Sequence, residues 1–131
     1  MLLDTSGLFC LFHAAEPQHQ LAITCFDAAE IKITTSYVLA EFIALAEARR
    51  LPRQMALEFV IDLQDSPEIV VVYVHDVLHR AAINLLQQRL DKPWSLCDAV
   101  SIVLMRQYGL YEALTTDHHF EQAGFRRLLI P

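Results

Sequence analysis

Short, mostly apolar runs alternate along the chain with longer segments in which apolar residues recur every three or four positions. The short runs lie at 1–4, 31–34, 68–74, 112–115 and 126–130 and are typical of buried strands. Helical spacing is found at 7–14, 18–29, 36–50, 52–64, 76–90, 95–108 and 117–123. Strands and helices in this order predict an α/β fold, a three-layer α/β/α sandwich with a short, mainly parallel central sheet of about five strands.

Polar residues mark where these helices should begin and end. Ser6, Ser36 and Ser95 each precede an apolar helical segment and are expected to act as N-caps. Gly109 follows the most apolar helix and fits its C-terminal cap. In the helix at 76–90, the residues expected to face the core are Val77, Ala81 and Leu85.

Composition narrows the class of protein. A chain of 131 residues that is 54% hydrophobic and 20% charged suits one folded domain, which we place at residues 1–131. Its three cysteines form no C-x-x-C pair, so we expect free, buried thiols in a reducing compartment. The chain opens on MLLD without a basic leader, and no apolar run is long enough to cross a bilayer. We therefore expect a cytoplasmic protein with no membrane contact.

Two acids are expected at the carboxyl ends of strands. Asp4 ends the first apolar run, and Asp117 follows the run at 112–115. In parallel α/β sheets, ligands bind beyond the carboxyl ends of the strands. Each acid also fits the simpler role of a helix N-cap, although Ser6 is the better cap beside Asp4.

Two further acids interrupt apolar helices. Asp98 lies in WSLCDAVSIVLM, a segment with almost no polar face, and an N-cap at Ser95 leaves it near the third helical position. Asp98 therefore either caps the helix or faces a polar cavity in the interior. Glu41 has apolar or aromatic neighbours at helical spacing, which place it on the buried stripe or at its boundary with water.

Taken together, the four acids predict a metal centre. Carboxylates share a small volume only when cations hold them together, and no Lys or Arg lies in the local sequence around Asp4, Glu41 or Asp98. Oxygen ligands of this kind suit Mg²⁺ or Mn²⁺. We expect Asp4, Glu41, Asp98 and Asp117 to be the catalytic residues and the metal ligands, with Asp4 and Asp98 binding the ion directly.

The motifs around these acids resemble the PIN-domain family. They are LLDTS at the start, S-x-x-x-x-E from Ser36 to Glu41, LCDA at 96–99 and LTTDHHFEQAGF at 114–125. Their order and spacing match the family along the whole chain, and a chain of this size is similar to the toxin ribonucleases of VapBC-type toxin–antitoxin pairs. The resemblance implies a PIN-like fold and an endoribonuclease that hydrolyses RNA with the help of Mg²⁺ or Mn²⁺.

The resemblance also implies supporting residues and partners. The four acids match the family's acidic positions, and Ser6 and Thr116 match hydroxyl positions that support the site. Many relatives carry another acid shortly after the position of Asp117, where this chain has His118 and His119. We expect the two histidines to be an exposed pair at a helix start. The expected partners are an RNA substrate, a cognate antitoxin and a second copy of the chain in a homodimer.

The net charge of −6 counts against a broad basic groove for nucleic acid. Two bound divalent ions would bring that charge from −6 to −2, and a few local cations would then assist RNA binding. The candidates for this role are Lys32, Arg49, Arg50 and Arg53.

One rival function stays open at this point. Because the extra acid after Asp117 is missing, the chain also fits a PIN-fold module that binds nucleic acid or protein with weak or no nuclease activity. A small-molecule phosphatase is disfavoured, since no Gly-rich phosphate loop is present.

Overall fold

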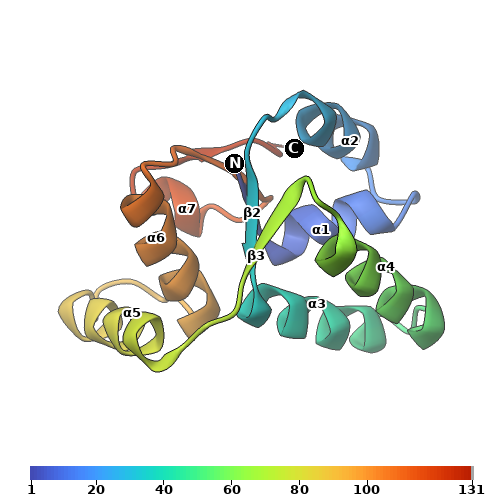
Figure 1. Ribbon diagram of the computed structural model, residues 1–131. Coiled ribbons are helices and arrows are strands. Elements are labelled where there is room, and N and C mark those ends of the chain that lie inside the picture. The colour runs from blue at the N-terminus through green and yellow to red at the C-terminus, as the bar shows by residue number, and fades with distance from the viewer. Residues whose placement is uncertain (131) are drawn as a thin grey trace.

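The computed structural model describes residues 1–130 and places a five-stranded sheet between two layers of helices (Figure 1). Every strand pairing in the sheet is parallel, and the strand order is β3-β2-β1-β4-β5. This confirms the predicted fold class. The strands are β1 (Leu2–Leu3), β2 (Lys32–Thr35), β3 (Ile69–Val72), β4 (Glu112–Leu114) and β5 (Arg126–Arg127).

The helices divide between the two faces of the sheet in the order in which the chain makes them (Figure 1). One face carries α1 (Thr5–Phe12), α2 (His19–Ala28), α3 (Ser36–Ala48) and α4 (Arg53–Asp65). The other carries α5 (Asp76–Gln88), α6 (Leu96–Tyr108) and α7 (His119–Gln122). None of these helices is long and apolar enough to cross a membrane.

Each face of the sheet has its own apolar core because side chains alternate along a strand. Leu3 packs into the cluster formed with α1–α4, around the fully buried Phe42. Its neighbour Leu2 packs into the cluster formed with α5–α7, which contains the fully buried Phe120. The central strand is therefore covered on both sides, as expected of a parallel sheet.

The chain changes direction across the sheet at β1. From β1 it builds β2 and β3 on one side, and it later adds β4 and β5 on the other. Connections that leave neighbouring strands in opposite directions open a crevice at the carboxyl ends of those strands, and ligands bind there. The crevice expected in this fold lies where β1 and β4 end, next to Asp4 and the loop that follows Leu114.

Several helix boundaries agree with the sequence, and two differ. Ser95 caps α6, and Gly109 ends it in the left-handed region at φ 65°. The α1 helix begins two residues earlier than predicted, so that Asp4 takes the N-cap position in place of Ser6. At α3 the cap is Thr35, whose hydroxyl accepts the Val38 amide, because Ser36 instead accepts the amide of Val74.

Of the three residues predicted to face the core from α5, Leu85 is buried and Ala81 is partly buried, but Val77 points to solvent. Val77 is 77% exposed, whereas Ala82 is fully buried and Leu85 is 7% exposed. A rotation of one residue, about 100° around the helix axis, carries a side chain from the core to the surface. The α5 helix meets α6 through Ala82 and Leu85.

Gly7 lets α1 lie directly against β4. A Cβ atom at this position would lie 1.9 Å from the carbonyl oxygen of Leu114. In an exposed helix, Gly→Ala adds stability, but here we expect Gly7→Ala to lower the free energy of unfolding by about 1–3 kcal/mol. Urea denaturation measures the change. A Gly7→Ala protein as stable as the wild type would contradict this packing.

Candidate active site

Asp4 sits at the carboxyl end of the central strand and is 4% exposed. Although it holds the N-cap position of α1, its side chain makes no capping hydrogen bond. Its Oδ2 instead accepts a hydrogen bond of 2.8 Å from the hydroxyl of Thr115, a residue 111 positions away in sequence. The simpler role of a helix cap therefore does not account for this carboxylate.

Thr115 is the centre of a hydroxyl network that links the ends of β1 and β4. Its Oγ1 also accepts the backbone amide of Asp117 at 3.0 Å and lies 3.0 Å from Oγ of Ser6. Because a hydroxyl has a single proton and Thr115 gives it to Asp4, Ser6 must be the donor in the Ser6–Thr115 pair. Ser6 also accepts the amide of Thr116 at 2.9 Å.

The two hydroxyl residues proposed as supporting groups therefore differ. Ser6 lies in the network, but Thr116 meets it only through its backbone, whose amide contacts Ser6 and whose carbonyl accepts from Arg127. The hydroxyl that reaches Asp4 belongs to Thr115, which the sequence argument missed. Two threonines precede Asp117 in the sequence, and the structure directs the first of them at Asp4, whereas the resemblance implied the second.

Asp98 takes the capping role, one of the two that the sequence left open, and it also contacts His119. It is 6% exposed, and its Oδ2 accepts the Ser95 amide at 3.1 Å, which completes a capping box with the Ser95 side chain. The same oxygen lies 2.9 Å from Nδ1 of His119. Within residues 1–130, the other oxygen, Oδ1, has no hydrogen-bond partner and remains available to a ligand.

Asp117 and His119 form a compact loop structure after β4. Asp117 Oδ1 accepts the His119 backbone amide at 2.9 Å, and Asp117 Oδ2 lies 3.2 Å from His119 Nδ1. The expectation of an exposed histidine pair was correct only for His118, whose side chain is 64% exposed. His119 is 20% exposed and lies between the carboxylates of Asp98 and Asp117.

Glu41 stands at the solvent side of this group. The residue is exposed, so its predicted place on the buried stripe of α3 was wrong, and the alternative at the boundary with water describes it better. It nevertheless belongs with the other acids. Burial and the charges of Glu41, Asp4 and Asp98 raise the pKa of the Cys97 thiol, which places all three carboxylates around one side chain.

The electrostatics of the site are dominated by Asp4. Burial is the main cause that raises its pKa to about 7, the neighbouring charges of Asp98 and Glu41 add to the rise, and hydrogen bonds from Thr115 and Thr5 oppose it. Among residues 1–130, no Lys or Arg forms an ion pair with Asp4, Glu41, Asp98 or Asp117. A cluster of oxygen donors with no basic side chain to balance it fits a divalent cation.

The basic residues nominated for RNA binding do not face this site. Lys32 is buried at the amino end of β2, whereas Asp4 lies at the carboxyl end of the neighbouring strand. The Nζ atom of Lys32 lies 3.8 Å from Oε2 of Glu68. Arg49, Arg50 and Arg53 follow the far end of α3, where Arg49 pairs with Glu16 and Arg53 pairs with Glu47. These placements rule out the local cation cluster that the sequence suggested.

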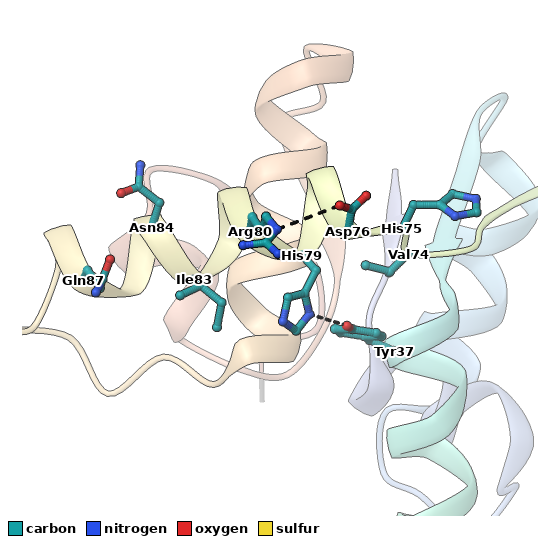
Figure 2. Close-up of a pocket in the computed structure, with 9 residues that line it drawn as sticks. All are labelled: Tyr37, Val74, His75, Asp76, His79, Arg80, Ile83, Asn84 and Gln87. Carbon is teal, nitrogen blue, oxygen red and sulfur yellow. Dashed lines mark hydrogen bonds and ion pairs between the residues drawn. The ribbon is translucent and has the colours of Figure 1, made fainter.

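A pocket of about 460 Å³ lies between α3 and α5, beyond the carboxyl ends of β2 and β3 (Figure 2). Tyr37 forms one wall, and its hydroxyl hydrogen-bonds to Nδ1 of His79. Tyr37 precedes Glu41 by one helical turn on α3, so the two side chains are neighbours on the helix surface. One wall of the pocket therefore lies one helical turn from Glu41.

Comparison with known proteins identifies the family. The family model for the PIN domain matches residues 1–126. The chain belongs to the PIN domain family. Ribonuclease VapC26 of Mycobacterium tuberculosis is 31% identical over 138 residues, and the alignment covers all of both chains.

Solved structures agree with this assignment. The crystal structure of Mycobacterium tuberculosis VapC20, described as a Sarcin-Ricin loop cleaving toxin, superposes with a TM-score of 0.86 at 26% identity and covers 95% of each chain. FitAcB from Neisseria gonorrhoeae shares the fold, with a TM-score of 0.61 at 18% identity over 96% of this chain and 94% of that one. The predicted family and enzyme class, a VapC-type metal-dependent ribonuclease, are confirmed.

The raised pKa of Asp4 predicts an unusual pH dependence of stability. Between the unperturbed value of 3.8 and about 7, the folded protein keeps a proton that the unfolded chain has released. The free energy of unfolding of the metal-free protein should therefore fall as pH rises through this window, by up to about 4 kcal/mol. Asp4→Asn cannot ionise and should remove this fall.

Thermal melting in EDTA at pH 5 and pH 8 measures the effect. We expect Asp4→Asn to raise Tm relative to the wild type clearly more at pH 8 than at pH 5. Asp62→Asn, an exposed acid on α4, is the control and should shift Tm equally at both pH values. An equal effect of Asp4→Asn at the two pH values would contradict the burial of a titrating carboxyl at this position.

Proposed function

We propose that Asp4, Asp98 and Asp117 hold Mg²⁺ or Mn²⁺, with Glu41 at the open side of the site, and that this centre hydrolyses RNA phosphodiester bonds. The observation that carries the proposal is the buried carboxylate of Asp4, which lies in the field of Asp98 and Glu41 without a compensating Lys or Arg among residues 1–130. Burying such charges is costly unless a cation balances them.

The side chains around the acids would hold the site in shape during the reaction. The Thr115 hydroxyl fixes Oδ2 of Asp4, and the Ser95 amide fixes Oδ2 of Asp98. A bound divalent ion would lower the pKa of a water and stabilise the charge that builds up on the phosphate. Glu41, the exposed carboxylate of the group, would accept the proton of the attacking water.

The substrate is best described as an unpaired loop of a folded RNA. A net charge of −6 and the absence of a local cation cluster give little attraction for the RNA backbone in general. Proteins that select RNA sequences read unpaired bases in loops, since the bases of a duplex are hard to reach. The relative VapC20 is described as cleaving the Sarcin-Ricin loop, which agrees with this type of substrate.

A cognate antitoxin, a homodimer and a cytoplasmic location complete the proposal. The similarity to Ribonuclease VapC26 suggests all three. Exposed apolar side chains on two helices offer contact surfaces. Co-expression with the product of a small adjacent open reading frame, followed by light scattering, would detect the complex and the dimer. Exposed apolar residues available for such contacts are Met55 and Ile61 on α4, and Val77 and Ile83 on α5.

RNA cleavage by point variants tests the centre. We expect Asp4→Asn and Asp98→Asn each to lower kcat/KM for a stem–loop RNA by about 100-fold or more, because each removes a charge from the metal centre. EDTA should abolish cleavage and Mn²⁺ should restore it, leaving 5′-phosphate and 3′-hydroxyl ends. Asp62→Asn is the matched control and should leave the rate unchanged. Undiminished cleavage by either site variant would overturn the assignment.

A further inference from the structure

His119 lies where a metal ligand would be expected. Its Nδ1 is 2.9 Å from Oδ2 of Asp98 and 3.2 Å from Oδ2 of Asp117. One ring nitrogen is thus directed at the oxygens of two carboxylates that come from different elements, α6 and the loop after β4. Asp117, His118 and His119 also offer ligand atoms that all lie within 4.8 Å of one another.

The backbone holds His119 in this position. Its amide donates to Asp117 Oδ1, and the Asp117 amide donates to Thr115 Oγ1, the hydroxyl that also binds Asp4. These hydrogen bonds connect the His119 backbone, through Asp117 and Thr115, to the carboxylate at the end of the central strand. His118 has no comparable support, since its side chain is 64% exposed and its Nδ1 is 3.6 Å from Asp117 Oδ1.

We propose that His119, with its ring proton on Nε2 and its Nδ1 turned from Asp98 to the ion, binds the divalent ion through Nδ1, so that this centre has a mixed nitrogen and oxygen ligand set that favours Mn²⁺ over Mg²⁺. Mg²⁺ is bound through oxygen, whereas imidazole suits the first-row transition ions. The role of His119 rests on the proposed metal centre. It adds to that centre a ligand of a different chemical type and a preference between two ions.

Pulsed electron paramagnetic resonance with one equivalent of Mn²⁺ tests this ligand without measuring activity. We expect the spectrum of the wild-type protein to show coupling to a directly bound ¹⁴N nucleus. His119→Gln should lose that coupling, and His118→Gln, the matched control, should keep it. In calorimetric titrations, His119→Gln should weaken Mn²⁺ binding by about 10-fold or more and Mg²⁺ binding less.

The outcomes separate the two proposals. The role of His119 is contradicted if the wild type binds Mn²⁺ without nitrogen coupling, or if the coupling persists in His119→Gln. Either result is still compatible with the carboxylate centre. If the wild-type protein binds no Mn²⁺ at all, both the proposed metal centre and the proposed role of His119 are contradicted.

A second inference comes from the pocket between α3 and α5, whose lining combines ring faces, apolar side chains and amides. Tyr37 and His79 meet edge to face, with ring centroids 6.0 Å apart, and Figure 2 shows His79 and Ile83 on the side of α5 that faces Tyr37. Farther along α5, Asn84 and Gln87 supply amide groups that both donate and accept hydrogen bonds.

We infer that this pocket binds an unpaired base of the RNA, next to the bond that is cut. Its volume of about 460 Å³ lies within the range of small-ligand sites. Aromatic side chains stack on bases, and amides hydrogen-bond to base edges. The pocket shares the sheet edge of the acid cluster, and Tyr37 stands one helical turn from Glu41, so a strand crossing the acids would reach it. This inference rests on the ribonuclease activity.

Binding of short RNAs tests the pocket apart from catalysis. With single-stranded oligoadenylate and oligouridylate in EDTA, we expect Tyr37→Ala and Asn84→Ala to raise Kd, by roughly 10-fold for Tyr37→Ala. Tyr37→Phe, which keeps the ring, should bind nearly as well as the wild type. Gln88→Ala, an exposed α5 residue outside the pocket, is the control.

Cleavage of a stem–loop RNA supplies the second readout. Asn84→Ala should raise KM and leave kcat nearly unchanged, since it removes a contact away from the acids. Unchanged Kd and KM in both Tyr37→Ala and Asn84→Ala would overturn the base pocket. Loss of cleavage in Asp98→Asn alongside that result would show that the nuclease assignment survives it.

Discussion

The burial of the Asp4 carboxylate at the end of the central strand is the constraint on which the rest of the site depends. A carboxylate that is 4% exposed needs compensation, and the folded chain supplies only part of it through the Thr115 hydroxyl and the Thr5 amide. The remaining cost appears as a pKa raised to about 7. A divalent cation would supply the missing compensation and would keep the group ionised at neutral pH.

The topology explains why this carboxylate has the neighbours that it has. Because β1 lies at the centre of the sheet and β4 beside it, residues 111 positions apart meet in one hydrogen bond. The first turn of α6 brings Asp98 to the same edge, where its capping box fixes the carboxylate. Gly7 completes the arrangement by allowing α1 to approach the backbone of Leu114. Sheet order, helix capping and one small residue thus all act on a single cluster of oxygens.

Much of this architecture follows from the sequence, because it depends on local signals. Alternating apolar runs locate the strands, Ser95 and Gly109 define the ends of α6, and acids at strand ends mark the functional edge of a parallel sheet. The assignment of four acids to one site drew further on the family's motifs. The structure gathers Asp4, Glu41 and Asp98 around Cys97 and links Asp117 to them through His119 and Thr115.

The parts that the sequence did not predict depend on orientation. Successive side chains in extended backbone point to opposite sides, so only one of Thr115 and Thr116 can reach Asp4, and the sequence does not say which. A helix position beside a buried one is turned by about 100°, which explains the exposed Glu41 next to Phe42 and the exposed Val77. His119 was missed because its contact with Asp98 joins residues 21 positions apart and exists only in the folded chain.

The central claim is that acids from separate elements form one divalent metal centre. Anomalous X-ray diffraction from crystals grown with Mn²⁺ tests it most directly. The account predicts an anomalous peak within bonding distance of the carboxylates of Asp4, Asp98 and Asp117, and its loss in crystals of Asp98→Asn. The absence of a peak at this cluster in wild-type crystals, or an undiminished peak in Asp98→Asn, would contradict the account.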